Sequence, residues 1–512
     1  MAELLSRAPV SSTPSKTGLV WYKYSDLRTS DHGPLHQAHA ENDSVAHAFV
    51  VDDRWLHTKT RFGMKKAGKF RMKFMLESLQ DLKANLQSKG SDLMVCIGKP
   101  EEAIPELAEA LGAGTVYCHS EICSEEHAVD VATKKRLPRG TGFWQCWGNT
   151  LFHLQELPFP ADGLPDTFTG FRKAVERRPG RPSAPLPAPP AVRPLPPAAG
   201  DLLVAWPVPT LGDLGFEEFE ADPRAVLDFR GGEAEGRRRV QGYFFERDCL
   251  REYKVTRNGM LGADYSSKLS PWLAHGCLSP RWVYQEIKRY EAERVANDST
   301  YWLVFELLWR DFFHFLALKH GNDIFKLGGT QRNPRKQAWA NDPEKLQAWC
   351  EGRTGYPFID ANMRELRASG FMSNRGRQNV ASFLVRDLGQ DWRAGAEFFE
   401  EWLVDYDPAS NWGNWTYAAG VGSDPREDRY FNIVKQANQY DGEGAYTRHW
   451  CPELAGCPPN LLFQPVMLND RMREQCNVAP GSYPRPIVSL RQSSFSGGGG
   501  RGGGGRGRGG GG

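Results

Sequence analysis

A proline-rich stretch divides this chain into two parts that must fold around separate cores. Residues 177–197 begin Arg-Arg-Pro-Gly-Arg-Pro-Ser-Ala-Pro and continue with further prolines. Such a stretch favours extended polyproline conformations and cannot build a core. We therefore expect two domains joined by a long linker, residues 161–230, that runs along them. At 512 residues the chain is long enough to bury a core in each domain.

The part before the linker alternates between strand-like and helix-like segments. Five short runs are apolar, β-branched or aromatic, namely residues 19–24, 45–51, 93–97, 115–118 and 143–146. Between them, apolar residues recur at helical spacing, with Pro100 as a first-turn proline and Ser124 as a cap. Strands that alternate with helices imply a parallel, doubly wound sheet, so residues 17–160 are predicted to be an α/β domain. The domain has no G-x-G-x-x-G motif, so a dinucleotide site is not expected in it.

Residues 231–460 are predicted to be almost wholly helical, and their chemistry is concentrated near the end. The segment Asp405-Tyr-Asp-Pro-Ala-Ser-Asn-Trp-Gly-Asn-Trp-Thr-Tyr417 gathers carboxylates, amides and aromatic rings. Its Asp-Pro and Asn-Trp-Gly turn signals predict a helix end, a tight loop and a new helix. Such a loop can aim a carboxylate and an amide at one heterocycle. Taken alone, the same pattern is also typical of a capped helix junction with core aromatics.

Further motifs at fixed distances decide between these interpretations. Trp392 precedes Trp415 by twenty-three residues, and Trp339 precedes Trp392 by fifty-three. Thr354-Gly-Tyr-Pro357 and Ser373-Asn-Arg-Gly-Arg377 lie in the same region. Together these motifs resemble the flavin domain of the photolyase/cryptochrome family, and in detail its cryptochrome-DASH branch. The resemblance runs from about residue 17 to residue 454 and implies an FAD photoenzyme with an α/β antenna domain before the helical FAD-binding domain.

The resemblance implies which residues hold one FAD per chain. Hydroxyls, a lysine and a helix N-terminus at residues 266–270 form an anion site, which the resemblance makes the FAD diphosphate cradle. We expect Ser270 to be the N-cap and Pro271 the first helical residue. By resemblance, Arg377 pairs with Asp405 near the isoalloxazine, and Asp407 accepts a hydrogen bond from the ring imide. The expected cofactor-binding residues are Tyr253, Ser266, Ser267, Lys268, Leu269, Ser270, Arg377, Asp405, Tyr406, Asp407 and Asn411.

The resemblance also assigns an electron path and a substrate pocket. Trp415, Trp392 and Trp339 would pass electrons inward from the surface. The fourth catalytic residue, Asn411, would face flavin N5, where an amide cannot supply a proton as a carboxylic acid could. A tryptophan plane can stack on a flipped-out thymine, and a carboxyl group can hydrogen-bond its imide edge. The expected substrate residues are Glu306, Trp309, Arg310, Asn374, Arg375, Gln378 and Tyr417.

Two of these positions indicate which lesion and which DNA are preferred. By resemblance, Gln378 falls where cyclobutane-dimer photolyases commonly carry Met and (6-4) photolyases a His. Because (6-4) chemistry needs a group that titrates near neutrality, the missing histidine argues against it. Tyr417 replaces a tryptophan of double-strand photolyases, which removes stacking area. We therefore expect light-driven splitting of cyclobutane pyrimidine dimers, preferentially in single-stranded or looped DNA. The alternative is a blue-light photoreceptor that signals to a protein or RNA partner. From the residues alone, Glu306 and Arg310 could also be a solvated ion pair beside core aromatics.

An antenna between the two domains is a further implication of the resemblance. The expected antenna is a reduced folate, 5,10-methenyltetrahydrofolate, with Glu126 in contact with its pterin. From the residues alone, Glu126 could equally be a solvated carboxylate at a helix start. The family's aromatic-Arg-Asn-Asp-Leu-Arg segment here reads Tyr22-Lys-Tyr-Ser-Asp-Leu-Arg28, which keeps Asp26 and Arg28 but loses the Arg and the Asn.

The two ends of the chain carry separate predictions. Residues 486–512 end in glycines broken by arginines and are predicted to be disordered, as a passive tail or as a binder of single-stranded nucleic acid or RNA. The Ser-, Thr- and Pro-rich first eighteen residues are a weak signal for a chloroplast or mitochondrion, with the cytoplasm or nucleus as the alternative. No apolar run approaches ~20 residues, so no membrane span is expected. The ten cysteines form no CxxC pair, so no metal site is expected. Separately, we expect the protein to be a monomer.

Overall fold

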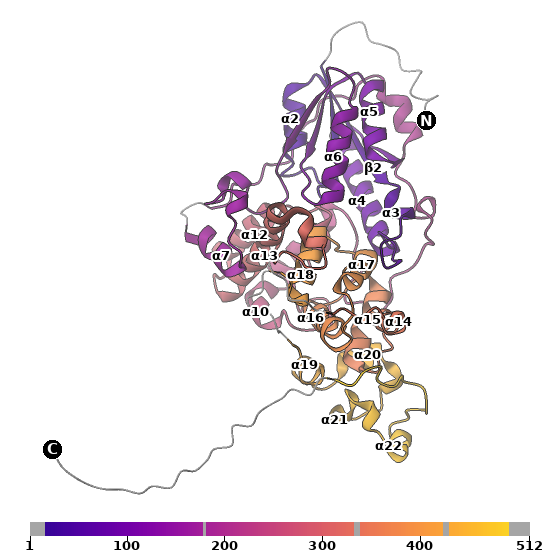
Figure 1. Ribbon diagram of the computed structural model, residues 1–512. Coiled ribbons are helices and arrows are strands. Elements are labelled where there is room, and N and C mark those ends of the chain that lie inside the picture. The colour runs from indigo at the N-terminus through magenta and orange to yellow at the C-terminus, as the bar shows by residue number, and fades with distance from the viewer. Residues whose placement is uncertain (1–15, 178–180, 332–337, 423–429, 491–512) are drawn as a thin grey trace, which may run out of the picture.

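The first domain is built around a parallel five-stranded sheet. The computed structural model (Figure 1) describes residues 16–177, 181–331, 338–422 and 430–490. The strand order is β3-β2-β1-β4-β5, and every neighbouring pair is parallel. The strands are β1 (Thr17–Tyr22), β2 (Ser44–Asp52), β3 (Met94–Gly98), β4 (Ala113–His119) and β5 (Gly142–Cys146). The predicted doubly wound α/β domain is confirmed.

Helices on both faces of the sheet complete the first domain. They are α2 (Gly33–Glu41), α3 (Arg54–His57), α4 (Lys69–Gln87), α5 (Pro100–Ala110) and α6 (Ser124–Arg136). Pro100 is the first residue of α5, as predicted. Ser124 is the first helical residue of α6 and Cys123 occupies the cap position, so the prediction that Ser124 caps this helix is wrong by one residue. Glu125 and Glu126 still lie in the first turn, where the helix dipole favours negative charge.

The segment between the domains follows the surface of both. Two short helices interrupt it, α7 (Phe168–Arg177) and α8 (Ala199–Ala205). Helix α7 packs on the long helix α13 (Asp298–His320) of the second domain. The N–H groups of Val45 and Val95, on the first domain, donate to the carbonyl oxygens of Pro194 and Trp206 at 2.9 and 3.1 Å. This linker, residues 161–230, is called the strap below. Backbone hydrogen bonds therefore hold the strap to the first domain at these two points.

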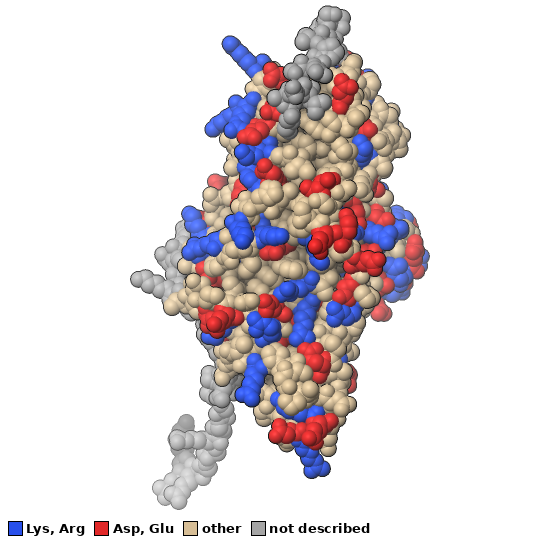
Figure 2. All heavy atoms as spheres, turned by 90° about the vertical axis from the view of Figure 1, so that its right-hand side faces the viewer, with Lys and Arg blue, Asp and Glu red and all other residues tan. Residues whose placement is uncertain are grey.

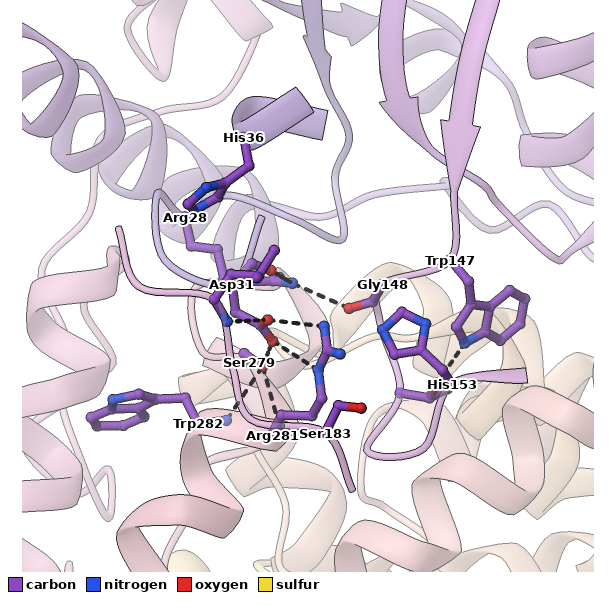
Figure 3. Close-up of polar contacts among 12 residues, drawn as sticks. Arg28, Asp31, His36, Trp147, Gly148, His153, Ser183, Ser279, Arg281 and Trp282 are labelled. Carbon is purple, nitrogen blue, oxygen red and sulfur yellow. Dashed lines mark hydrogen bonds and ion pairs between the residues drawn. The ribbon is translucent and has the colours of Figure 1, made fainter. Parts of the chain in front are cut away.

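One buried carboxylate, that of Asp31, joins the first domain, the strap and the second domain (Figure 3). It accepts hydrogen bonds from Arg281 at 2.9 and 3.1 Å, from the Ser279 hydroxyl, and from the N–H of Leu186 at 3.0 Å. The N–H of Asp31 donates to the Leu186 carbonyl at 2.7 Å. Asp31 is fully buried and has φ = 50°, a conformation rare outside glycine. Burial opposes ionisation, but the Arg28 and Arg281 guanidiniums lower the pKa of Asp31 below its ordinary value.

The second domain is helical, as predicted; among its described residues the single β interaction is an isolated bridge between Ala340 and Gln390. Its helices are α9 (Glu233–Gln241), α10 (Tyr253–Thr256), α11 (Ser270–Ala274), α12 (Pro280–Glu293), α13 (Asp298–His320), α14 (Pro343–Cys350), α15 (Pro357–Ser369), α16 (Asn374–Ser382), α17 (Trp392–Trp402), α18 (Pro408–Ala419), α19 (Ile433–Tyr440), α20 (Ala445–Trp450), α21 (Pro459–Leu462) and α22 (Asp470–Gln475). Helix α13 is largely buried and packs against α10, α12 and α18.

The surface carries both signs of charge. On the face shown in Figure 2, basic and acidic side chains are interspersed, consistent with a net charge of only +2. Within the described ranges, no helix combines the length and apolar character needed to span a bilayer. The predicted N-terminal signal and Gly/Arg tail fall mainly on residues 1–15 and 491–512, which lie outside the described residues.

Candidate functional site

One cavity of about 770 Å³ in the second domain gathers most of the residues singled out from the sequence. Its wall is formed by the segment from α10 to α11 and by helices α13, α16 and α18. All of the predicted cofactor-binding residues and all of the predicted substrate residues line it. Trp415 also lines it, whereas Trp392, which is fully buried, and Trp339, which is partly buried, are not among its lining residues. The structure thus brings the two predicted residue sets together; their individual roles stay predictions.

The loop before α11 differs in detail from the expected anion cradle. Ser270 is the first helical residue, Pro271 the second, and Leu269 occupies the cap position without a side-chain bond, so the prediction of Ser270 as N-cap is wrong. Lys268 has φ = 52°, and its ammonium donates to the carbonyl oxygens of Gly262 and Ala263 at 3.1 and 2.9 Å. Burial lowers the pKa of Lys268 to about 7. This lysine therefore braces the loop; its charge is not extended toward an anion.

A residue that sequence reasoning missed, Arg239 on α9, fixes the same loop. Its guanidinium donates to the carbonyl oxygens of Ser267, Ala263 and Ser266 at 2.9, 2.8 and 3.1 Å. It also pairs with Asp264 at 2.9 Å. No local pattern links α9 to residues 263–267, so only the fold could reveal this contact.

The predicted ion pair at the centre of the cavity is present. Arg377 donates to Asp405 Oδ2 at 2.8 Å and to the Met372 carbonyl at 2.9 Å. Asp405 is buried, and its other oxygen, Oδ1, has no hydrogen-bond partner among the described residues. A buried, unsatisfied acceptor in a cavity wall is costly in an isolated protein. A bound ligand with an N–H or O–H group would satisfy it.

Asp407 and Asn411 are both held by protein groups. Asp407 Oδ1 caps α18 by accepting from the Ser410 N–H at 2.6 Å, and Oδ2 accepts from His314 Nε2 at 2.9 Å. Burial opposes ionisation, but His314 and Arg310 lower the pKa of Asp407 well below its ordinary value. A carboxylate can accept further bonds, so a ring imide can still reach it. Asn411 Nδ2 donates to the Ala396 carbonyl at 3.0 Å, which fixes the orientation of the amide.

On the predicted substrate side of the cavity, one alternative from the sequence is corrected. Glu306 pairs with Arg257 at 2.6 Å, so the alternative of a solvated Glu306–Arg310 pair is wrong. Burial raises the pKa of Glu306, although Arg257 opposes this. Arg310 instead donates to the Asn149 and Leu273 carbonyls and lies 3.8 Å from Asp407. Arg257 is a wall residue that the sequence did not single out.

Trp309 is fixed by aromatic neighbours. The Phe168 ring, from α7, stacks on it with centroids 3.7 Å apart and planes 8° apart. Tyr417 meets it edge-on at 6.1 Å. On the opposite wall, Arg375 donates to Gln378 at 2.8 Å and to Asn258 at 2.9 Å. One face of Trp309 is thus occupied by protein, and stacking of a base is restricted to what remains exposed.

A second cavity, about 70 Å³, lies between the two domains. Aromatic side chains and carboxylates line it, including Tyr24, Trp55, Trp147, Glu121, Glu126, Glu400 and Tyr406. Burial raises the pKa of Glu121 to about 8 and that of Glu126 to about 7. The predicted antenna contact, Glu126, therefore lies in a mixed aromatic and acidic wall. Glu121 and Glu400 were missed because their sequence contexts carry no motif.

Residues of segment 22–28, which departs from the family's sequence pattern, make polar contacts with other parts of the first domain. Lys23 forms a buried ion pair with Asp130, and the Ser25 hydroxyl donates to Glu121 at 2.6 Å. Asp26 lies between His32 and His119, at 3.3 and 2.7 Å. The ligand atoms of this trio come within 4.8 Å of one another, but His32 Nδ1 accepts the Leu35 N–H. Neutral His32 then carries its hydrogen on Nε2, facing Asp26 without a formed hydrogen bond, while His119 Nδ1 bonds to Asp26 Oδ2, so the trio does not present three free ligand atoms to a metal ion.

A helical domain with this cavity, behind a parallel-sheet domain, defines a flavoprotein of the photolyase type. The model of the FAD binding domain of DNA photolyase matches residues 302–496, and that of DNA photolyase matches residues 18–191. Cryptochrome DASH of Gloeobacter violaceus is 49% identical over 94% of this chain and 94% of its own length. The chloroplastic/mitochondrial cryptochrome DASH of Oryza sativa subsp. japonica is 47% identical over 94% of this chain and 81% of its own length. The crystal structure of Synechocystis cryptochrome superposes with a TM-score of 0.89 at 48% identity, covering 94% of this chain and 98% of that one.

The chain belongs to the photolyase/cryptochrome family, in its cryptochrome-DASH branch. Its second domain is the FAD-binding domain of that family. The residues present fit the flavin, because the unsatisfied Asp405 Oδ1 and the Asp407 carboxylate offer acceptors for a heterocycle with N–H groups.

Proposed function

We propose that this protein is a photolyase that uses blue or UV-A light to split cyclobutane pyrimidine dimers, preferentially in single-stranded or looped DNA. One observation carries the proposal: the residues expected to contact flavin and those expected to contact a dimer line a single cavity. An extruded dimer would therefore share one enclosed space with the flavin. Bound FAD supplies the one-electron chemistry, and the protein positions the reactants.

The residues of the cavity have distinct tasks in this proposal. Arg377 holds Asp405 in place, and Asp407, held by His314, presents a second acceptor to the flavin. Glu306, oriented by Arg257, offers a carboxyl group to the imide edge of a thymine. Trp309 supports a base by stacking. Asn411 has no titratable proton, so it cannot act as an acid toward the flavin.

The preference for single strands follows from a comparison of energies. Extraction of a dimer from a duplex costs a few kcal/mol of unpairing and unstacking. One base–aromatic stack contributes about 1–3 kcal/mol, so the loss of one stacking ring is comparable with that cost. Tyr417 meets Trp309 edge-on and offers less area than an indole, while Gln378 is engaged by Arg375.

We further propose 5,10-methenyltetrahydrofolate as an antenna in the second cavity. Flat aromatic walls suit a pterin, and the carboxylates of Glu121, Glu126 and Glu400 suit its amino and ring N–H groups. Light absorbed there would reach the flavin cavity nearby, since Tyr406 and Asp407 line both spaces.

The proposed partner is single-stranded DNA that carries the dimer, bound by a monomer. The plant relative named chloroplastic/mitochondrial supports a location in one of these organelles, with the cytoplasm or nucleus as the alternative. The second candidate function is a blue-light photoreceptor, which the name cryptochrome of the relatives favours. Such a receptor could contact RNA through the Gly/Arg tail.

The decisive experiment measures light-dependent dimer repair by the purified, FAD-loaded protein on matched single-stranded and duplex DNA. Glu306→Gln removes the carboxyl group offered to the dimer. Its matched control is Glu286→Gln on α12, because Glu286 is also paired with an arginine but is not among the residues that line the cavity. We expect repair that is faster on single strands and reduced by Glu306→Gln alone. No repair of either substrate in light, with FAD retained, would refute the photolyase proposal and favour the photoreceptor. Equal repair of both substrates at matched salt would refute the strand preference.

A further inference from the structure

Trp415 contacts another indole, that of Trp349, which is not part of the expected electron path. Trp415 is 2% exposed, and its indole lies 6.3 Å from that of Trp349, with the planes 74° apart. Trp349, on α14, is fully buried, and its Nε1–H donates to the Val380 carbonyl at 3.1 Å. Phe399 flanks both rings, at 5.1 Å from Trp415 and 6.4 Å from Trp349. The two indoles therefore form a rigid, close pair.

The expected second member of the path, Trp392, is placed differently. Its ring packs on Trp412 at 5.7 Å, and its Nε1–H donates to the Leu327 carbonyl. Among the ring contacts of the described residues, none joins Trp392 to Trp415 or to Trp339. Gly395, three residues after Trp392 on α17, packs against Trp415 of α18, and a methyl group added there would lie 2.2 Å from Trp415 Cη2. The ring contact of Trp415 with another indole is therefore the one with Trp349.

We propose that Trp349 is a second electron donor to Trp415, in competition with Trp392. The inference rests on the proposed function, in which photoexcited oxidised flavin is the oxidant of Trp415. One electron then leaves the Trp349 indole and restores Trp415, so the positive charge moves to Trp349 and no bond is formed or broken. Electron-transfer rates fall steeply with distance, and the ring contact of Trp349 with Trp415 is close enough for direct transfer between the two indoles.

The surroundings of Trp349 determine what becomes of that charge. Its N–H is bonded to a backbone carbonyl, which is too weak a base to remove the proton. The next aromatic rings are Phe398, 5.5 Å away, and beyond it Trp402, 5.9 Å from Phe398. The Arg367 guanidinium lies 5.3 Å over the Trp402 ring, where it disfavours a second positive charge. The charge therefore remains on Trp349 as a buried radical cation, from which it returns by way of Trp415.

The test compares tryptophan-radical yields after a light flash in the FAD-loaded parent and in variants. These are Trp392→Phe, Trp349→Phe, the double variant and Trp415→Phe. Trp450→Phe is the control, since Trp450 is equally buried, and among the described residues the aromatic and cationic groups paired with its ring are His449 and Arg224, with no tryptophan. Transient absorption gives the yield, and pulsed electron paramagnetic resonance gives the distance between flavin and radical. FAD content per chain and thermal unfolding check that each variant is folded.

We expect Trp392→Phe to show a radical at the flavin–Trp349 distance, which the double variant lacks because its radical can only remain on Trp415, with Trp450→Phe unchanged. A radical confined to Trp415 in Trp392→Phe would overturn the inference and leave the proposed function standing. Full radical yield in Trp415→Phe would instead refute the proposed electron path itself. If Trp349→Phe does not fold, the radical distance in Trp392→Phe decides, because a radical confined to Trp415 excludes Trp349 as a donor.

Discussion

Replacement of Phe168 tests whether the strap between the domains shapes the substrate site. Phe168 is 6% exposed, and its ring lies flat on Trp309 at 3.7 Å. Phe168→Leu keeps most of the apolar volume and removes the stacked pair, which contributes about 0.5–1.5 kcal/mol beyond burial. Phe168→Ala also removes the volume and should cost about 3–5 kcal/mol. Phe171→Leu is the matched control, because Phe171 is on the same helix and fully buried, but its ring neighbours do not include Trp309.

The assays are denaturant unfolding and the affinity for a single strand that carries one thymine dimer. We expect Phe168→Leu and Phe171→Leu to reduce stability to a similar extent. Dimer affinity should fall only in Phe168→Leu, because Trp309 is then no longer held in one orientation. The loss should be at most that of one base–aromatic stack, about 1–3 kcal/mol. Equal dimer affinity in the two leucine variants would refute the argument that Phe168 positions Trp309.

Three further predictions concern the two cavities. Tyr417→Trp should raise repair of duplex DNA relative to single strands, because it restores about 1–3 kcal/mol of stacking; an unchanged ratio of rates would exclude stacking as the cause of the preference. Arg377→Ala should weaken FAD binding by about 3 kcal/mol, or about 100-fold, because it leaves Asp405 buried without its partner. FAD titration measures this loss. The control Arg393→Ala breaks a comparable pair with Asp391 outside the cavity and should leave FAD affinity unchanged. Burial raises the pKa of Glu126 to about 7, so the folded state binds a proton that the unfolded state has released, and stability should fall as pH rises from about 5 to about 7. Glu126→Gln should reduce that fall in thermal unfolding midpoints, and a parallel pH profile would contradict the assignment.

The fold could be predicted from local patterns in the sequence, because alternating strand and helix periods imply the parallel sheet. The cavity residues Arg377, Asp405 and Trp309 were predicted from the resemblance to the photolyase/cryptochrome family, which the spaced motifs carry. Contacts between distant segments could not be predicted. Arg239 and Arg257 reach loop carbonyls and Glu306 from helices that share no motif with them. The same holds for Trp349, which lies 66 residues before Trp415 in the sequence and meets it only in the folded domain.

Helix starts show how a one-residue shift changes the chemistry. Ser124 and Ser270 both have the residue type of an N-cap, yet each is the first residue inside its helix. The lysine at position 268 was expected to attract an anion, but its ammonium is occupied by loop carbonyls. Residue type therefore predicted where the loops lie, while the direction of each polar group depended on partners elsewhere in the chain.

The position of Asp31 has a consequence for synthesis on the ribosome. The carboxylate is made early, inside the first domain, but its partners Ser279 and Arg281 follow the complete sheet and the strap. Until those residues emerge, a nascent first domain that closes around Asp31 encloses a charge that has Arg28 nearby but lacks Arg281 and Ser279, on a backbone already in an unfavourable conformation. Its final compaction is therefore delayed until the start of α12 has been translated. A ribosome stalled before Arg281 should hold a first domain that is cut by protease near residue 31, and one stalled well beyond it should hold a resistant one.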